Sequence, residues 1–254
     1  MMITSVIRSF FVYAVVQSLY LFPTFATAQR LNIVQYAPDD TWLHYSSMIN
    51  TVKNGNGNEL NLDDTSQLSD GHLISIAYEA YQEMEDKHEE GEFGDQPRAM
   101  AALQVKNQIF LSSSLKHNED GFMAQFPNSR ASIALERCSA ASAQDQWDVN
   151  AQHTGDTYRT NGNCGEPAAV HLFYREHPDE PEGALPEPAR MVAVTRGNGG
   201  MRIMNPCEAP NAQYPNTWGC SRFMTDLRIR AIWQGTVEVA IPGDWGFYWG
   251  TTCL

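Results

Sequence analysis

The sequence predicts an α/β fold: a mixed β-sheet of about five strands, flanked by helices and preceded by a helical and irregular N-terminal segment. Of the 254 residues, 43% are hydrophobic and 19% are charged, a composition typical of a globular protein with a substantial core. Segments with helical periodicity alternate with strand-like segments, in the order helix, hairpin, helix, strand, helix, strand, strand. We therefore predict an α/β domain over residues 97–254, preceded by a polar loop and an amphipathic helix within residues 29–96.

The first 28 residues have the features of a secretory signal peptide. Arg8 precedes an apolar run, and the small residues Ala26 and Ala28 suit cleavage after Ala28. The alternative is a transmembrane anchor, but Gln17 and Pro23 leave the run short of about 20 apolar residues. We expect a secreted protein that does not associate with membranes after cleavage.

The chain is strongly acidic, with 17 Lys and Arg against 30 Asp and Glu and a net charge of −13. Removal of residues 1–28 takes away only the charge of Arg8, so the mature net charge is −14 (16 minus 30). Phosphate backbones repel such a protein, which argues against broad binding to duplex nucleic acid. Three arginines late in the chain, Arg222, Arg228 and Arg230, are expected on solvated surface rather than in a basic groove.

The N-terminal part of the mature chain is predicted to be a loop followed by one helix. Residues 29–61 are polar and turn-rich, and their Asn-Gly repeats predict a flexible loop. A helix is predicted over Leu68–His88, where apolar residues recur at spacings of three and four after an N-cap at Ser69 or Asp70. The acidic run Glu83–Glu92 is expected to be its solvated end rather than a cation site.

A β-hairpin follows, with strands predicted at Met100–Val105 and Gln108–Ser113 around a Lys-Asn turn. Residues 116–161 are expected to be a long irregular connection with one candidate helix around Arg130–Arg137.

The next helix is expected to start at Cys164 and to run to Tyr174, because Pro167 is tolerated in a first turn. The remaining chain predicts strands at Arg190–Thr195, Met201–Met204, Ile229–Trp233 and Thr236–Ile241, and a helix at Ser221–Leu227. The aromatic tail Trp245–Trp249 is expected to be a core plug or an edge strand rather than a stacking platform for bases.

The residues that could bind a metal or take part in catalysis are concentrated in residues 161–223. Cys164 and Glu166 lie at a predicted helix start, and Cys207 and Cys220 follow in turn-rich sequence. Three thiolates can hold Zn²⁺ and leave its fourth position open to water, as a hydrolytic site requires. Glu166 is too close to Cys164 to be an obvious fourth ligand, but it is well placed to move protons.

This pattern resembles the zinc-dependent cytidine deaminase-like superfamily. In that superfamily a hairpin precedes a helix opened by His or Cys, any residue and Glu, and a later helix carries Pro-Cys-x-x-Cys. The matching residues here are Cys164, Glu166, Pro206, Cys207 and Cys220. The resemblance implies a deaminase-like sheet and Zn²⁺ bound by the three cysteines. It also implies that Glu166 takes a proton from water and delivers it to a ring nitrogen and then to the leaving amine, with release of ammonia.

The sequence departs from this motif at two positions. Gly165 stands where Ala is common, and 12 residues separate Cys207 from Cys220 where the motif has two. The inserted segment, Glu208–Gly219, is rich in proline and is expected to be a loop. Both cysteines can still bind one metal ion if this loop bulges out and Cys220 alone opens the helix.

The five cysteines also allow an interpretation without metal. Disulfides are the default in a secreted protein, and a Cys207–Cys220 disulfide would pin the inserted loop. Three zinc thiolates with a Cys138–Cys253 disulfide would use all five cysteines instead. The competing hypothesis is therefore a disulfide-stabilised secreted interaction protein on a deaminase-like fold without catalytic zinc.

Two histidines are candidate substrate contacts. His153 lies shortly before Cys164 and could also be an alternative ligand, and His171 follows Cys164 by seven residues on the same helix face. A histidine in such a position is more often an ordinary surface or core residue than a functional one.

The preferred hypothesis is a secreted zinc-dependent hydrolase that deaminates a nucleobase, a nucleoside or a related heterocycle. The acidic charge favours a free base or nucleoside, or a narrow single-stranded nucleic acid, over a duplex. Resemblance to secreted members of the superfamily further implies a toxin or effector.

Overall fold

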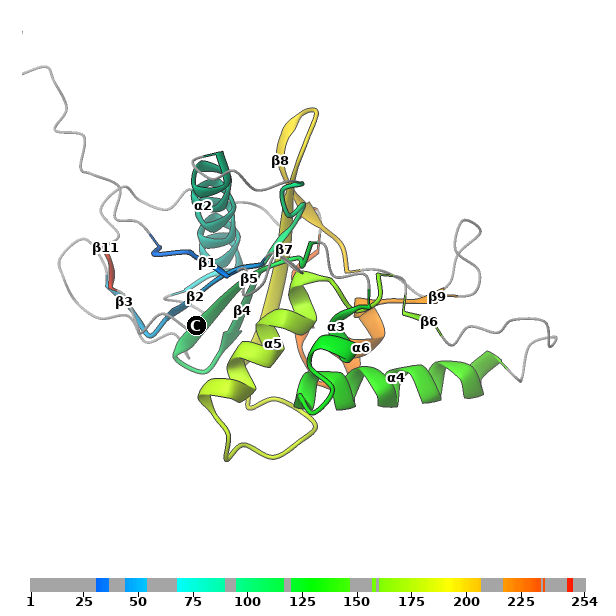
Figure 1. Ribbon diagram of the computed structural model, residues 1–254. Coiled ribbons are helices and arrows are strands. Elements are labelled where there is room, and N and C mark those ends of the chain that lie inside the picture. Colours follow the sequence, from blue (N-terminus) through cyan, green and yellow to red (C-terminus); the bar gives the residue numbers. More distant parts are fainter. Residues whose placement is uncertain are drawn as a thin grey trace, which may run out of the picture. The chain divides into compact units, whose positions relative to one another are not determined.

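A mixed β-sheet lies at the centre of the computed structural model, with helices on both of its faces (Figure 1). The structure describes residues 31–36, 44–53, 68–89, 95–116, 120–146, 157–158, 160–206, 217–233, 235 and 246–248. All of them belong to one compact unit, Leu31–Leu254. The predicted signal peptide, residues 1–28, lies outside the described residues.

The sheet has seven strands. Their bounds are β1 Val34–Tyr36, β2 His44–Ile49, β4 Met100–Val105, β5 Gln108–Ser113, β7 Ala189–Gly197, β8 Gly200–Met204 and β10 Arg230–Ala231. The order is β1-β2-β5-β4-β7-β10, and β8 also pairs with β7. β4 is antiparallel to β5 and β7, whereas β10 is parallel to β7. The predicted α/β class is confirmed, and the sheet is larger than predicted.

Two of the additional strands come from the segment predicted to be a polar loop, residues 29–61. All six residues of β2 are buried, although the strand contains two serines and a histidine. Their polar groups find partners, since Ser47 Oγ donates a hydrogen bond to Leu31 O at 2.8 Å and His44 Nε2 lies 2.7 Å from Ser112 Oγ. The loop prediction was wrong here because polarity does not exclude burial when side-chain hydrogen bonds are satisfied.

The predicted hairpin β4–β5 is confirmed with unchanged bounds. Lys106 in its turn has a φ of 49°, as two-residue hairpin turns require. The two strands predicted at residues 190–195 and 201–204 are confirmed as β7 and β8, and they pair antiparallel. β10 is shorter than the predicted strand, and the strand predicted at residues 236–241 lies outside the described residues.

Helix α2 (Asp70–Glu89) covers one face of the sheet, as the periodicity of residues 68–88 predicts. The opposite face carries α5 (Gly165–Glu176), α4 (Arg130–Gln146) and α6 (Cys220–Asp226). Alternate residues of β4 point to the two sides, so that Leu103 lies in the cluster under α5 and Ala102 in the cluster under α2. The result is three layers, with the sheet between helices.

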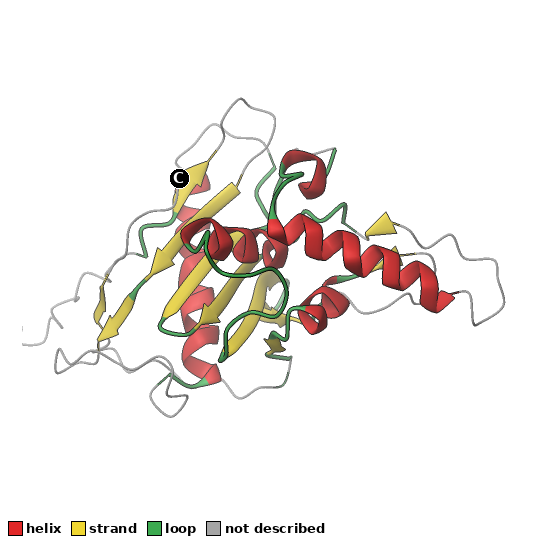
Figure 2. Cartoon of the chain, turned by 90° about the horizontal axis from the view of Figure 1, so that it is seen from below, coloured by secondary structure: helices red, strands yellow, loops and turns green. Residues whose placement is uncertain are grey.

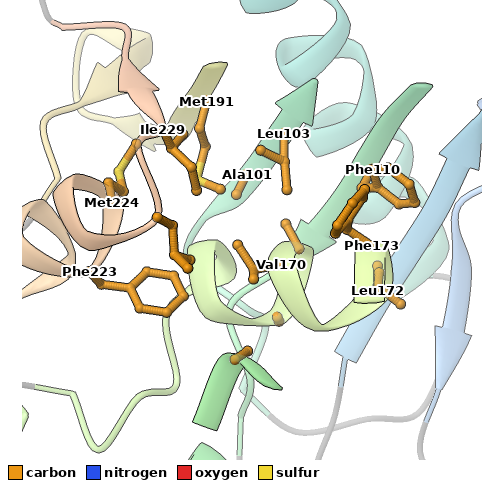
Figure 3. Close-up of a cluster of buried hydrophobic side chains, with 14 of the residues drawn as sticks. Ala101, Leu103, Phe110, Val170, Leu172, Phe173, Met191, Phe223, Met224 and Ile229 are labelled. Carbon is orange, nitrogen blue, oxygen red and sulfur yellow. The ribbon is translucent and has the colours of Figure 1, made fainter. Parts of the chain in front are cut away.

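Helix α5 is held on the sheet by apolar packing. Val170 and Phe173 of α5 face Leu103 and Phe110, and Phe223 packs beside the start of α5 (Figure 3). The rings of Phe110 and Phe173 meet edge to face with centroids 5.7 Å apart. This packing fixes the position of α5 on the sheet.

The connection predicted to be irregular, residues 116–161, contains two helices in its described part, α3 (Phe122–Gln125) and α4. The candidate helix at Arg130–Arg137 is confirmed, but α4 continues to Gln146 and extends beyond the sheet (Figure 2). The longer helix agrees with its alanine-rich sequence, since alanine has the highest helix propensity.

Two short pairs of strands complete the fold. β3 (Thr51–Lys53) pairs with β11 (Gly246–Tyr248), so the aromatic tail contributes a strand, one of the two alternatives expected for it. β6 (Thr157–Tyr158) pairs with β9 (Thr217–Trp218) in parallel. None of the helices in the described part of the chain is both long and apolar enough to cross a membrane.

Candidate metal centre

Cys164 is the N-cap residue of α5, and Glu166 lies in the first turn of that helix. The helix start therefore agrees with the prediction. Cys164 is extended, with φ of −69° and ψ of 156°, and is half-buried, whereas only 7% of Glu166 is exposed. An acidic side chain in the first turn interacts favourably with the helix dipole.

A tight turn delivers the chain to Cys164. The amide of Asn163 donates to the carbonyl of Thr160 at 2.9 Å, and the two residues between them, Asn161 and Gly162, have φ of 52° and 74°. These are the features of a type I′ turn, which Asn-Gly favours. The turn brings Thr160 Oγ1 to 2.9 Å from Cys164 Sγ, a hydrogen-bonding distance.

Gly165 lets the start of α5 rest directly on the sheet. A Cβ at this position would lie 2.7 Å from Ser112 O and 3.1 Å from Ala101 Cβ. Such contacts are shorter than van der Waals packing allows. The glycine that departs from the deaminase-like motif is therefore required by close approach to β4 and β5.

Cys220 is the first residue of α6, after the N-cap Gly219. The parallel pair β6–β9 joins the chain before Cys164 to the chain before Cys220, with Tyr158 opposite Trp218. This pairing holds the chain before one helix start beside the chain before the other, and Cys220 opens α6.

These elements bring Cys164, Glu166 and Cys220 together. Their sulfur and carboxylate oxygen atoms all lie within 4.8 Å of one another. Two ligands bound at about 2.3 Å to a tetrahedral ion lie about 3.8 Å apart, so small side-chain rotations would let the group share one ion. Thiolate and carboxylate are both zinc ligands. The group could hold a metal ion.

Two of the predicted site residues, Cys207 and His153, lie outside the described residues. Pro206, which directly precedes Cys207, is buried at the end of the described segment 160–206.

His171 is not brought into the group of potential ligands. Its Nδ1 lies 2.8 Å from Ser129 Oγ, and its ring packs on that of Phe126 with centroids 4.5 Å apart. Burial lowers the pKa of His171 from 6.5 to about 4, and the charge of Arg175 adds to the effect. His171 therefore packs as a neutral residue between α5 and the preceding segment.

The predicted disulfides Cys138–Cys253 and Cys207–Cys220 stay predictions, because Cys207 and Cys253 lie outside the described residues. Cys138, predicted to pair with Cys253, is a free buried thiol in α4, and Cys253 lies outside the described residues. Burial raises the pKa of Cys138 to about 11, with a further contribution from Asp226. No disulfide joins Cys164 to Cys220.

Thr160 was not identified from the sequence, although a hydroxyl four residues before a potential thiolate ligand is a usable signal.

Scans against protein-family models, curated proteins and solved structures find no match to this chain. Its function is therefore inferred from the site and from the order of the elements around it.

Proposed function

We propose that this protein is a secreted zinc-dependent deaminase that hydrolyses the exocyclic amine of a nucleobase, a nucleoside or a related heterocycle. The observation that carries the proposal is the convergence of Cys164, Glu166 and Cys220 within 4.8 Å at the starts of α5 and α6. Cys207, the residue after Pro206, would supply the third thiolate.

The order of the elements supports this assignment. A hairpin, β4–β5, precedes the helix opened by Cys-Gly-Glu; a strand, β7, and the helix opened by Cys220 follow. This is the order that the resemblance to the deaminase-like superfamily implies. Glu166 lies beside Cys164 and Cys220, and a Cys207–Cys220 disulfide would give this glutamate no role. Its position therefore favours an enzyme over an interaction protein stabilised by that disulfide.

In the proposed reaction the protein's own residues position the metal and move protons. Cys164, Cys220 and Cys207 would hold Zn²⁺, and when bound the ion would make hydroxide available near neutral pH. Glu166, buried beside them, would accept a proton from the attacking water and return it to the ring nitrogen and then to the leaving amine. The substrate would be a base or nucleoside, or a narrow single-stranded nucleic acid, since the net charge of −13 disfavours duplex.

The test combines elemental analysis with ammonia release on a panel of bases, nucleosides and single-stranded oligonucleotides. We expect natively purified protein to contain one zinc per chain and Cys220→Ala to lose it. Glu166→Gln is expected to keep zinc and fold but to lose turnover, because the amide cannot take up the proton.

The matched control is Cys138→Ala, which removes a thiol that lies outside the site and should retain both zinc and activity. Turnover retained by Glu166→Gln would eliminate the proton-transfer role. Absence of zinc in the natively purified protein would eliminate the enzyme assignment.

A further inference from the structure

The Sγ atoms of Cys164 and Cys220 are near enough for a second chemistry besides metal binding. They lie within 4.8 Å of one another, and no disulfide joins them in the structure. An S–S bond is about 2 Å long, so the sulfur atoms would have to close a gap of less than about 3 Å. The type I′ turn before Cys164 and the β6–β9 pair before Cys220 keep the two helix starts adjacent.

The two thiols differ in exposure. Cys164 is half-buried, whereas Cys220 is 0% exposed. A reagent in solution would therefore meet Cys164 first, and Cys220 would be reached only through Cys164. This is the arrangement of an attacking and a resolving cysteine in thiol–disulfide exchange.

We propose that Cys164 and Cys220 form a redox-active pair that small-molecule disulfides oxidise to a Cys164–Cys220 disulfide, and that bound metal protects the pair. The protection by metal rests on the proposed function, because the same thiolates would be the metal ligands. The oxidation itself does not depend on that function. Oxidation would remove two of the site's potential ligands and so switch off metal binding.

Oxidised glutathione takes up the two electrons that the two thiols lose. The Cys164 thiolate attacks one sulfur of oxidised glutathione, an S–S bond forms to Cys164, and one glutathione thiolate leaves. The Cys220 thiolate then attacks Cys164 Sγ, the protein disulfide forms, and the second glutathione leaves. The protein loses two electrons and two protons, and one glutathione disulfide becomes two glutathione molecules.

The test uses the full mature chain, reduced, stripped of metal and incubated with oxidised glutathione. We expect the intact mass to fall by two hydrogens and peptide mapping without reductant to show the Cys164–Cys220 linkage. Added zinc should prevent the loss of these two thiols, and dithiothreitol should restore them.

Two variants separate the steps. Cys220→Ser is expected to stop as a mixed disulfide between Cys164 and glutathione, and Cys164→Ser to leave Cys220 unmodified. Cys138→Ser, the matched control, should still form the linkage. A linkage through Cys207, or no linkage in the metal-free wild type, would overturn the proposal. Equal oxidation with and without zinc would refute the protection by metal and would contradict the proposed deaminase function. The proposal that Cys164 and Cys220 form a redox pair would remain supported.

Discussion

Thr160 Oγ1 lies 2.9 Å from Cys164 Sγ, so the residue that begins the turn before α5 contacts the first potential metal ligand. Partners of this kind orient a ligand, and their loss typically weakens metal affinity by about 10- to 100-fold. We expect Thr160→Val to weaken zinc binding by that factor in competition with a chromophoric chelator. Thr160→Ser, which keeps the hydroxyl, should bind as the wild type does, and unchanged affinity in Thr160→Val would show that the contact is incidental.

Gly165→Ala is expected to destabilise the protein by roughly 1–3 kcal/mol, because its Cβ would overlap Ser112 O and Ala101 Cβ. The start of α5 would have to move away from the sheet, so zinc affinity should fall as well. Denaturant unfolding and chelator competition measure the two effects. Gly199→Ala is the control, since a Cβ there meets nothing within 4 Å. Equal stability of the two variants would contradict the close approach.

The protein should lose stability as the pH falls from about 6.5 towards 4. Burial lowers the pKa of His44 from 6.5 to about 3, and the positive charge of Arg175 adds to the effect, as does His171 once it is protonated near pH 4. The unfolded chain therefore binds more protons than the folded chain below pH 6.5, at a cost of roughly 1 kcal/mol per pH unit for this residue. His44→Gln should reduce the slope of the free energy of unfolding between pH 4 and 6.5. An identical slope in the variant would show that His44 is not neutral in the fold.

Asp70 is expected to stabilise the sheet through the buried guanidinium of Arg190. Arg190 Nη1 donates to Asp70 Oδ1 at 2.8 Å, and the Arg190 side chain is only 2% exposed. Asp70→Asn leaves this buried cation without its counter-charge, so we expect a loss of roughly 3 kcal/mol in denaturant unfolding. The control is Asp226→Asn, which removes an ion pair to Arg137 that is more exposed and should cost less than about 1 kcal/mol. Equal losses would show that the burial of Arg190 is not decisive.

Several elements were predictable because their signals are local. The periodicity of α2, the Lys-Asn turn of β4–β5 and the start of α5 at Cys-Gly-Glu-Pro each depend on a few neighbouring residues. β2 was missed for the opposite reason. Its serines and histidine look like loop residues until the partners of His44 and Ser47, which come from distant segments, are known.

The features of the site also fall into those that the sequence predicts and those that need the fold. Cys164, Glu166 and Cys220 were predicted as site residues because their types and their place at helix starts are visible in the chain. The sequence alone could not say that Thr160 contacts Cys164, that Gly165 is required by Ser112, or that His171 turns to Ser129 instead of joining the potential ligands.

The sequence by itself determined the α/β class, most helices and strands, and which residue types could bind a metal, since periodicity, turn chemistry and ligand chemistry are properties of short segments. Only the tertiary structure decided that the starts of α5 and α6 meet. That meeting depends on the pairing of β6 with β9 and on the packing of α5 against β4 and β5. Those contacts join residues far apart along the chain, and their free energy belongs to the assembled sheet rather than to any one segment.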